Sequence, residues 1–382
     1  MHAHNPKINV LLANDHLGWK GSHLHGVGRY FLNIIPNFSD LVSVVPCIMR
    51  KKDGLDKFFK GKNIKVNYFS RTKFDPRTLL DFIRIIKREN INIMHLQGYA
   101  ATTFGRIAGI LCNVPTLLHQ RDADPNHPGY MIFPDILLAF GPGKGLAVSQ
   151  YTKEFLAEKR KIPLDKIKAL INPIDISKIV SVSESDIVAV KQSINYHPNL
   201  KIIGMITRFY PVKGIECLIK ASPKIIRKHK DVIFILCGDG PLLNELIGLT
   251  ERMNVQKHFL FPGFVDNPNA WVSVFDIMVS SSYSEGCPNS ILEAMALKRG
   301  IVCTKSGGPE EFLENEFSAL MPEPGDVDAI ASSILKLLDD PDYRDYLASN
   351  AGKAAQWYDV KNYLKRLEAI YRSVVNDHYS ST

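Results

Sequence analysis

The chain has 382 residues, of which 45% are hydrophobic and 23% are charged. This composition is ordinary for a soluble globular protein, and the length suits two domains. No stretch approaches the ~20 consecutive apolar residues that a membrane-spanning helix needs. The formal net charge of +8 favours anionic partners such as phosphates, acidic membrane surfaces or nucleic acid.

The N-terminal segment predicts a strand rather than an export signal. Its apolar stretch covers only residues 8–13 and is followed by Asn14 and Asp15, so it is too short for a signal sequence. The six cysteines form no C-x-x-C pair, which argues against a zinc site and against a disulfide framework. We therefore expect a reduced, cytoplasmic protein.

Strand-like runs alternate with segments of helical period through the first half. The predicted strands cover residues 8–13, 41–48, 64–69, 91–96, 116–119 and 145–149. The predicted helices cover residues 26–35, 78–88, 104–111 and 151–159. Such alternation is typical of parallel α/β layers.

Basic residues gather between Arg50 and Lys65, with Phe58 and Phe59 among them. We interpret this cluster as a solvated charged face, and a membrane-docking surface is the alternative. Nucleic acid is the least favoured partner, because the sequence contains no recognition module such as a zinc finger.

A second α/β series follows a segment that has the character of a hinge. Residues 172–199 contain Pro173, Pro198 and a serine-rich patch, as linkers often do. Beyond it we predict strands at 201–206, 232–237, 259–262, 276–281 and 301–304. Helices are expected at 215–229, 241–252, 290–297, 327–338 and 360–374.

These elements predict two Rossmann-like domains that face each other across a cleft. The expected division is residues 1–175, a hinge at 176–199, a second domain at 200–356, and a C-terminal helix and tail at 357–382 that cross back to the first domain. Ligands of such sheets bind at the carboxyl ends of the strands.

The segment SSSYSEGCPNSILEAMALKRG, residues 280–300, is the most informative. An apolar strand ends in small polar residues, turns at Gly286, and enters a helix at Pro288 or Asn289. A helix that starts beyond a strand's carboxyl end presents N–H groups suited to a phosphate or a sugar hydroxyl. Glu285 precedes this helix and Glu293 lies one turn inside it, so the two carboxylates occupy different depths of one site.

EGCPNSILE resembles the E-x7-E pattern of the family 4 retaining glycosyltransferases, with Gly286, Pro288 and Glu293 in the expected places. Further matching segments follow in the same order as in that family: Arg208 with Lys213-Gly214, Gly238-Asp239-Gly240-Pro241, Gly263-Phe264-Val265, Gly307-Gly308-Pro309-Glu310, and a terminal helix with Trp357 and Tyr371. The resemblance covers nearly the whole second half and, more loosely, the first. It implies the two-domain GT-B fold.

The resemblance also implies roles for residues of the second half. Arg208 and Lys213 match the pair that binds the donor diphosphate, which makes a metal ion unnecessary, and no other cofactor is expected. Glu293 matches the residue that binds the ribose diol, and Glu285 the one that faces the donor sugar. The backbone of Gly286, Cys287, Pro288 and Asn289 is expected to hold sugar hydroxyls. Gly238, Gly263, Phe264 and Val265 complete the donor site, the last three near the base.

Two features of the first half resemble the same family. Gly26 and Gly28 in HLHGVGRYF match its glycine-rich loop, preceded here by His25. His119, which ends the strand TLLH, matches the histidine that points towards the donor sugar.

The expected activity is the transfer of a hexose-type sugar, with retention of configuration, from a UDP- or GDP-linked donor to a hydroxyl group of a glycan, a glycolipid or a small molecule. Bacterial-type cell-surface polysaccharide or glycolipid synthesis is the expected setting. Residues 286–289 and 307–310 are expected to set the choice of sugar. Two alternatives stay open: a nucleotide-sugar epimerase of the same fold, and a non-catalytic glycosyltransferase-like subunit.

Overall fold

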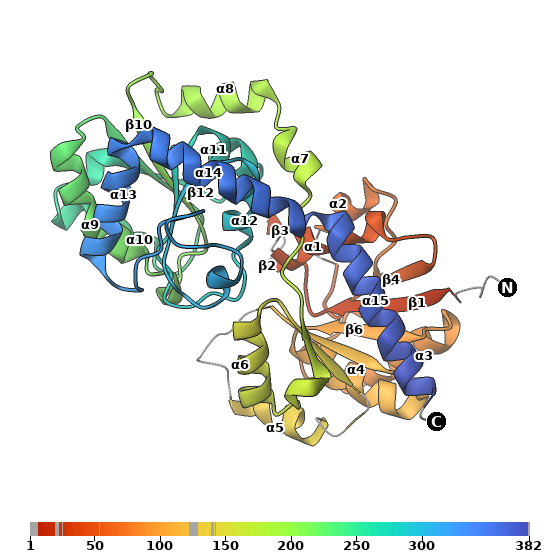
Figure 1. Cartoon of the computed structure of the whole chain (residues 1–382). Helices are drawn as coiled ribbons and strands as arrows, with labels where there is room; N and C mark the ends of the chain where they lie inside the picture. The colour runs from red at the N-terminus through yellow and green to blue at the C-terminus, as the bar shows by residue number, and fades with distance from the viewer. Residues whose placement is uncertain are drawn as a thin grey trace. The chain divides into compact units, whose positions relative to one another are not determined.

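The computed structural model describes residues 7–19, 23–24, 26–52, 54–121, 129–138, 141 and 143–380. The chain forms two compact units (Figure 1). The first unit combines Met1–Pro173 with Val360–Thr382, and the second is Ile174–Asp359. The C-terminal segment therefore returns to the first unit, as the sequence predicted.

The first unit contains a seven-stranded parallel sheet in the order β5-β4-β1-β6-β7-β8-β9. Its strands are β1 (Ile8–Asn14), β4 (Val42–Ile48), β5 (Asn67–Tyr68), β6 (Ile93–Gln97), β7 (Thr116–Gln120), β8 (Lys144–Ala147) and β9 (Ile167–Ala169). A small antiparallel pair, β2 (Gly18–Trp19) and β3 (His23–Leu24), follows β1. The helices are α1 (Gly26–Ile34), α2 (Asp56–Lys60), α3 (Arg77–Arg88), α4 (Tyr99–Cys112), α5 (Gly129–Leu138), α6 (Gln150–Arg160) and α15 (Val360–Tyr379).

Strand β1 shows how the sequence builds a two-sided core. Val10 and Leu12 belong to the cluster that α1 and α15 cover, whereas Leu11 and Ala13 belong to the cluster under α3 and α4. Successive side chains of a strand point to opposite faces, so an unbroken apolar run is buried on both sides of the sheet. Helix α15 supplies an apolar stripe that includes Leu367 and the fully buried Tyr371.

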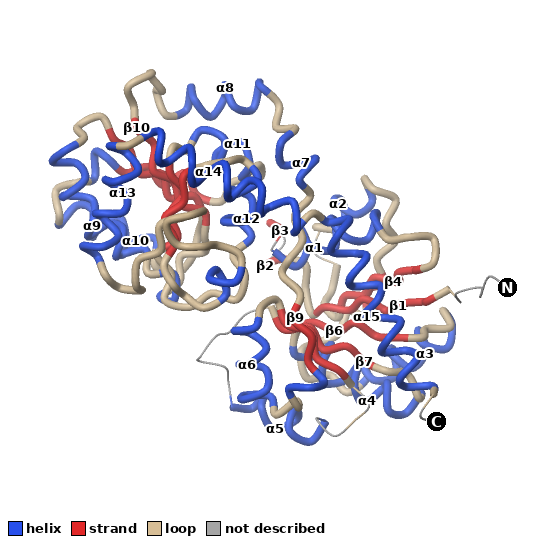
Figure 2. The backbone as a smooth tube through the Cα atoms, in the orientation of Figure 1, coloured by secondary structure: helices blue, strands red, loops and turns tan. Residues whose placement is uncertain are grey.

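The second unit contains a five-stranded parallel sheet in the order β12-β11-β10-β13-β14. Its strands are β10 (Lys201–Ile206), β11 (Val232–Cys237), β12 (Phe259–Gly263), β13 (Ile277–Ser280) and β14 (Gly300–Cys303). Its helices are α7 (Ile176–Val180), α8 (Glu184–Ser193), α9 (Ile215–Lys228), α10 (Leu243–Arg252), α11 (Pro268–Val274), α12 (Asn289–Ala296), α13 (Val327–Asp339) and α14 (Pro341–Ala355). Helices α9, α10 and α13 cover one face of this sheet, and α11, α12 and α14 cover the other (Figure 2).

Both sheets have the strand order of a Rossmann fold. The order of strands reverses between β1 and β6 in the first unit and between β10 and β13 in the second. Ligands of open parallel sheets bind where the order reverses, beyond the carboxyl ends of the strands. These two points are therefore where binding residues are expected.

The structure differs from the predicted elements in several places, and it contains β9, α2, α5 and α11, which were not predicted. Residues 176–199, predicted as a hinge, contain α7 and α8, which pack on α12 and α11 of the second unit. Only Asn67–Tyr68 of the predicted strand 64–69 pairs with β4, because Ile64 and Val66 bury their side chains without joining the ladder. Helix α14 was not predicted, since its apolar positions do not form a clear helical stripe.

Candidate active site

A small pocket lies where the strand order of the second unit reverses. It is lined by the end of β10, the end of β13 and the start of α12, from residues Met205, Ile206, Thr207, Val279, Ser280, Ser281, Ser282, Glu285 and Ser290. Small polar side chains at the ends of buried strands line this pocket. The predicted carboxylate Glu285 is therefore part of this pocket.

Lys213 and Glu285 form an ion pair beside this pocket. The Lys213 Nζ lies 2.7 Å from Glu285 Oε1, and the two side chains are 12% and 11% exposed. The hydroxyl of Ser282 donates a second hydrogen bond, of 2.8 Å, to the same carboxylate oxygen. Ser282 was not predicted, although its place just after β13 is the signal that could have found it.

Gly214 allows the Lys213 segment to reach β13. Its φ is +55°, and a Cβ at this position would lie 2.2 Å from the carbonyl oxygen of Ser281. A side chain is disfavoured in that backbone conformation and has no space there. The Ser281 hydroxyl donates a 2.7 Å hydrogen bond to the Gly214 carbonyl, which fixes the two loops together.

The two segments predicted to select the sugar lie against each other. The Glu285 N–H donates to the Ser306 carbonyl and the Gly308 N–H donates to the Glu285 carbonyl, both at 2.9 Å. A Cβ at Gly308 would lie 1.7 Å from the carbonyl oxygen of Gly286. Glycine is therefore the residue that permits this approach.

Helix α12 begins directly after this loop. Pro288 is its N-cap, Asn289 is its first residue, and no side chain caps the helix. An uncapped helix start carries partial positive charge. Gly286 and Cys287 are buried, while Glu285 and Glu293 are both half-buried, with Glu293 one turn inside the helix.

The other predicted donor residues lie at the ends of the neighbouring strands. Arg208 follows β10 and is exposed, and its Cζ lies 5.2 Å from the centroid of the Tyr210 ring. Gly238 follows β11, and its N–H donates a 2.8 Å hydrogen bond to the carbonyl of Gly263 at the end of β12. Phe264 and Val265 come next and are half-buried.

The predicted residues of the first unit lie at the start of α1 and near the end of β7. Gly26 and Gly28 belong to the first turn of α1, in the helix predicted over residues 26–35. A Cβ at Gly28 would lie 2.9 Å from the carbonyl oxygen of Leu17, so close packing explains this glycine. His25 lies outside the described residues. His119 is 3% exposed, and its Nδ1 is hydrogen-bonded at 2.8 Å to Nε2 of His95, a residue that the sequence analysis missed.

The two phenylalanines of the basic segment between Arg50 and Lys65 differ in burial. Phe59 is fully buried, whereas Phe58 is 39% exposed with Lys57 Nζ 5.2 Å from its ring centroid. Of the two phenylalanines, only Phe58 is thus on the surface. Among the described residues, no helix is long and apolar enough to cross a membrane.

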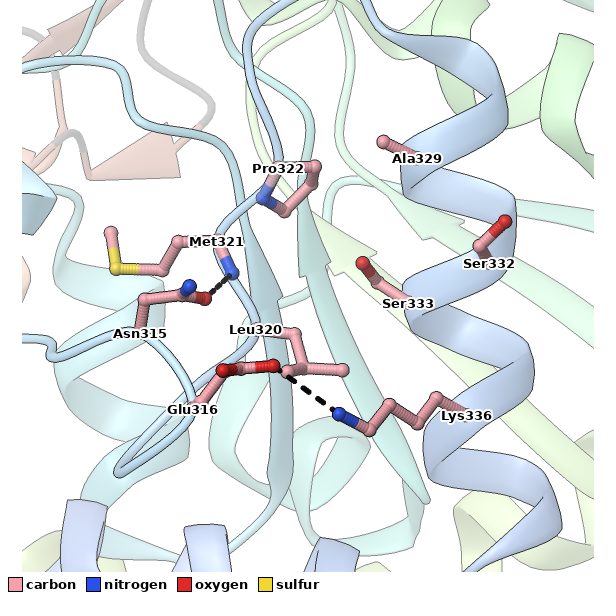
Figure 3. Close-up of a pocket in the computed structure, with 9 residues that line it drawn as sticks. All are labelled: Asn315, Glu316, Leu320, Met321, Pro322, Ala329, Ser332, Ser333 and Lys336. Atoms are coloured by element: carbon pink, nitrogen blue, oxygen red, sulfur yellow. Dashed lines mark hydrogen bonds and ion pairs between the residues drawn. The ribbon is translucent and has the colours of Figure 1, made fainter.

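A second pocket lies between residues 315–322 and α13 (Figure 3). The ion pair of Glu316 with Lys336, at 3.3 Å, spans it. The Asn315 side-chain oxygen accepts a 2.8 Å hydrogen bond from the Met321 N–H. Because these polar groups bind one another and no predicted donor residue lines the pocket, we do not assign the site to it.

Two family models match the chain in succession. The model described as glycosyltransferase family 4 matches residues 24–178, and the model described as glycosyl transferases group 1 matches residues 188–354. The chain belongs to this family of glycosyltransferases. The second model covers every residue that we predicted for the donor site of the second unit.

Several characterised or named glycosyltransferases are similar along most of their length. The Escherichia coli UDP-Gal:alpha-D-GlcNAc-diphosphoundecaprenol alpha-1,3-galactosyltransferase is 22% identical over 79% of this chain and 80% of its own. The N-acetyl-alpha-D-glucosaminyl L-malate synthase of Bacillus anthracis is 23% identical over 82% of this chain and 84% of its own.

Solved structures share the fold. Anabaena HepE, crystallised with UDP-glucose, has a TM-score of 0.82 at 21% identity and covers 96% of this chain and 100% of its own. A glycosyltransferase from Rickettsia africae has a TM-score of 0.80 at 20% identity and covers 97% of this chain and 99% of its own. The predicted GT-B fold of this glycosyltransferase is therefore confirmed.

Proposed function

We propose that this glycosyltransferase transfers a hexose-type sugar from a UDP- or GDP-linked donor to an acceptor hydroxyl, with retention at the anomeric carbon. The observation that carries the proposal is the contact between Lys213 and Glu285 at the point where the strand order reverses. The resemblance gives Lys213 to the leaving diphosphate and Glu285 to the sugar. The bond that breaks joins the diphosphate to the sugar, so the side chains of Lys213 and Glu285 should meet beside that bond.

The chemistry of the step follows from these charges. The bond between the anomeric carbon and the phosphate oxygen breaks, and the nucleoside diphosphate leaves with the electron pair. Lys213 and Arg208 stabilise the negative charge that develops on it, and a metal ion is not needed for that purpose. The acceptor oxygen bonds to the anomeric carbon on the face that the diphosphate leaves, and its proton passes to the departing phosphate oxygen.

Glu285 stabilises positive charge on the sugar during this step. Its carboxylate is already held by Lys213 and Ser282, which fixes its position before the donor binds. The uncapped start of α12 supplies partial positive charge for the donor phosphates or sugar oxygens. Glu293, with two acceptor oxygens, binds the two ribose hydroxyls.

The acceptor is a glycan or a lipid-linked precursor from which a cell-surface polymer is built. The alternative acceptor is a smaller anionic molecule. The names of the two relatives above contain diphosphoundecaprenol and L-malate, both of which carry negative charge. The net charge of +8 supports an anionic acceptor. The enzyme acts in the cytoplasm, and docking of the Phe58 surface on anionic lipid is the alternative that vesicle sedimentation at low salt tests.

A thermal-shift screen with UDP, GDP, ADP and their common sugars, each with and without EDTA, tests the donor site. A ligand present at 100 times its Kd stabilises the folded protein by about 2.7 kcal/mol. We expect one nucleotide to raise the melting temperature regardless of EDTA, and Arg208→Ala and Glu293→Ala to abolish the rise. Lys224→Ala is the matched control, because Lys224 pairs with Asp328 on the surface, 3.2 Å away. The absence of any shift from folded protein would overturn the proposal.

A further inference from the structure

A cluster of polar side chains, all buried except the half-buried last member, lies at the carboxyl end of the first sheet, beside the point where its strand order reverses. Its members are Tyr30 of α1, His95 and Gln97 of β6, His119 of β7, and Arg121, which follows β7. We call these five residues the histidine–arginine cluster. All of them belong to the first unit, whereas Lys213 and Glu285 belong to the second.

Three polar atoms of this cluster are buried without a hydrogen-bond partner: Gln97 Oε1, His119 Nε2 and Arg121 Nη1. The Gln97 and His119 side chains are 2% and 3% exposed. Buried polar atoms in native proteins are almost always hydrogen-bonded, because an unpaired one has lost water without replacing it. Three such atoms in one place indicate a site that a polar ligand completes.

A chain of hydrogen bonds determines whether His119 presents a donor or an acceptor to that ligand. The hydroxyl of Tyr371 lies 2.6 Å from His95 Nδ1, and His95 Nε2 lies 2.8 Å from His119 Nδ1. Burial, with Arg121 as the second cause, lowers the pKa of His95 to about 3. Burial also lowers the pKa of His119 well below its ordinary value. Both rings are therefore neutral.

Two neutral rings carry one proton each, so the position of the Tyr371 proton sets both tautomers. The buried Tyr371 hydroxyl bonds to His95, and it satisfies its own proton by donating to His95 Nδ1. His95 then carries its proton on Nε2 and donates it to His119 Nδ1. His119 is left with its proton on Nε2, the atom that has no partner. The cluster thus presents one N–H donor from His119.

Arg121 supplies a positive charge next to this donor. Its Cζ lies 4.3 Å from the centroid of the Tyr30 ring, a stacked position that orients the guanidinium group. Within the described ranges, no carboxylate forms an ion pair with Arg121. Arg121 is half-buried, and its Nη1 atom is buried without a hydrogen-bond partner, so a ligand that brings negative charge would complete it.

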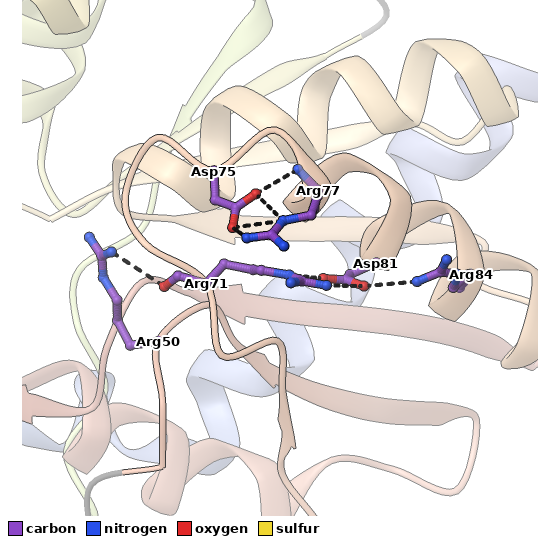
Figure 4. A network of polar contacts seen from close by, with 6 residues as sticks. All are labelled: Arg50, Arg71, Asp75, Arg77, Asp81 and Arg84. Carbon is purple, nitrogen blue, oxygen red and sulfur yellow. Dashed lines mark hydrogen bonds and ion pairs between the residues drawn. The ribbon is translucent and has the colours of Figure 1, made fainter.

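Several other arginines of the first unit pair with carboxylates. Arg71 lies 2.6 Å from Asp81 and Arg77 lies 2.7 Å from Asp75, in the network that Figure 4 shows. Arg160 forms buried hydrogen bonds with Asp135. Arg121 differs from these arginines because no carboxylate in the described part of the chain pairs with it.

We propose that Arg121 binds the phosphate or carboxylate of an anionic acceptor, next to the N–H that His119 presents, and this assignment rests on the proposed transferase function. The guanidinium fork matches the paired oxygens of either anion. Gln97 Oε1 accepts a hydrogen bond from a hydroxyl of the same molecule. Arg121 is thus a specificity-determining residue that selects acceptors by their negative charge.

Binding of methyl phosphate and of acetate to the whole chain tests this assignment. Both would be titrated by calorimetry at constant ionic strength, with the wild type, Arg121→Gln, Arg121→Lys, Lys213→Gln and Arg84→Gln. Arg84 is the matched control, because its side chain is 73% exposed and pairs with Asp81. Comparing the two anions shows whether the subsite takes a phosphate or a carboxylate.

We expect at least one anion to bind the wild type, Arg84→Gln and Lys213→Gln alike. Arg121→Gln should weaken binding at least tenfold, and Arg121→Lys should do so less. Without ligand, Arg121→Gln should melt at or above the wild-type temperature, because the change removes a buried guanidinium nitrogen that has no hydrogen-bond partner. Unchanged binding in Arg121→Gln, binding lost in Lys213→Gln instead, or no binding to the wild type would each overturn the proposal.

Nucleotide binding in the same samples separates the two proposals. If UDP or GDP binds and neither anion does, the Arg121 subsite fails and the transferase function stands. If an anion binds through Arg121 and no nucleotide binds anywhere, the transferase function fails, and with it the assignment of this anion to an acceptor.

Discussion

Replacing Lys213 and Glu285 singly and together tests whether their contact is a real interaction in the unliganded protein. The perturbations are Lys213→Met, Glu285→Gln and the double variant. Exposed ion pairs contribute ~0–1 kcal/mol, and breaking a fully buried pair costs ~3–5 kcal/mol. The coupling of this pair should lie between these two values, because its side chains are 12% and 11% exposed and Ser282 stays bonded to the carboxylate. We expect a coupling free energy of roughly 2 kcal/mol.

Urea unfolding followed by tryptophan fluorescence measures that coupling. Of the three tryptophans in the chain, Trp271 and Trp357 lie in the second unit and report on its unfolding. Because mutations at independent sites add to within ~0.5 kcal/mol, a double variant whose loss of stability equals the sum of the single losses would refute the reasoning. The pair would then be a surface contact without energetic weight.

Three further predictions concern other parts of the fold. The pKa of His95 is lowered to about 3, from an ordinary value of about 6.5. The stability that neutral His95 contributes is therefore complete above that ordinary value and is lost as the pH falls through the lowered one. The free energy of unfolding should fall less steeply with acid in His95→Asn than in the wild type. Gly308→Ala places a Cβ 1.7 Å from the Gly286 carbonyl oxygen and should cost about 3 kcal/mol and weaken nucleotide binding. Gly61→Ala, whose Cβ would lie no closer than 3.6 Å to a neighbouring atom, should leave both unchanged. Asp15 accepts N–H bonds from Ala100 and Ala101 at 3.1 and 2.9 Å, so Asp15→Ala should lower stability by about 1–2 kcal/mol and Asp15→Asn by less, measured by urea unfolding.

The sequence predicted the sheets of both units well, because buried parallel strands carry apolar runs that alternate with helices. The apolar residues of β1 needed no knowledge of distant contacts to be recognised. Elements with weaker patterns were not found, as with α14, or were placed outside the domain to which they belong, as with α7 and α8. In those segments the burial depends on the helices against which they pack, such as α11 and α12.

The candidate site was predictable as a set of residues but not as a geometry. The spacing of Glu285 and Glu293 follows from one helix start, which is local. The contact of Lys213 with Glu285 joins residues 72 positions apart, and the bond of His95 to Tyr371 spans 276 positions. Such contacts arise from the strand order and from the return of α15, so a single sequence without its fold did not reveal the cluster around Arg121.

The most direct test of the transferase assignment is the configuration of the sugar released from its donor. Proton NMR would follow the chain incubated with an α-linked UDP- or GDP-hexose in the presence of EDTA, with water as the acceptor and Lys213→Ala as the control. The account predicts slow cleavage that releases the α-anomer first and is lost in Lys213→Ala. Release of the β-anomer first, or cleavage that survives Lys213→Ala, would contradict it.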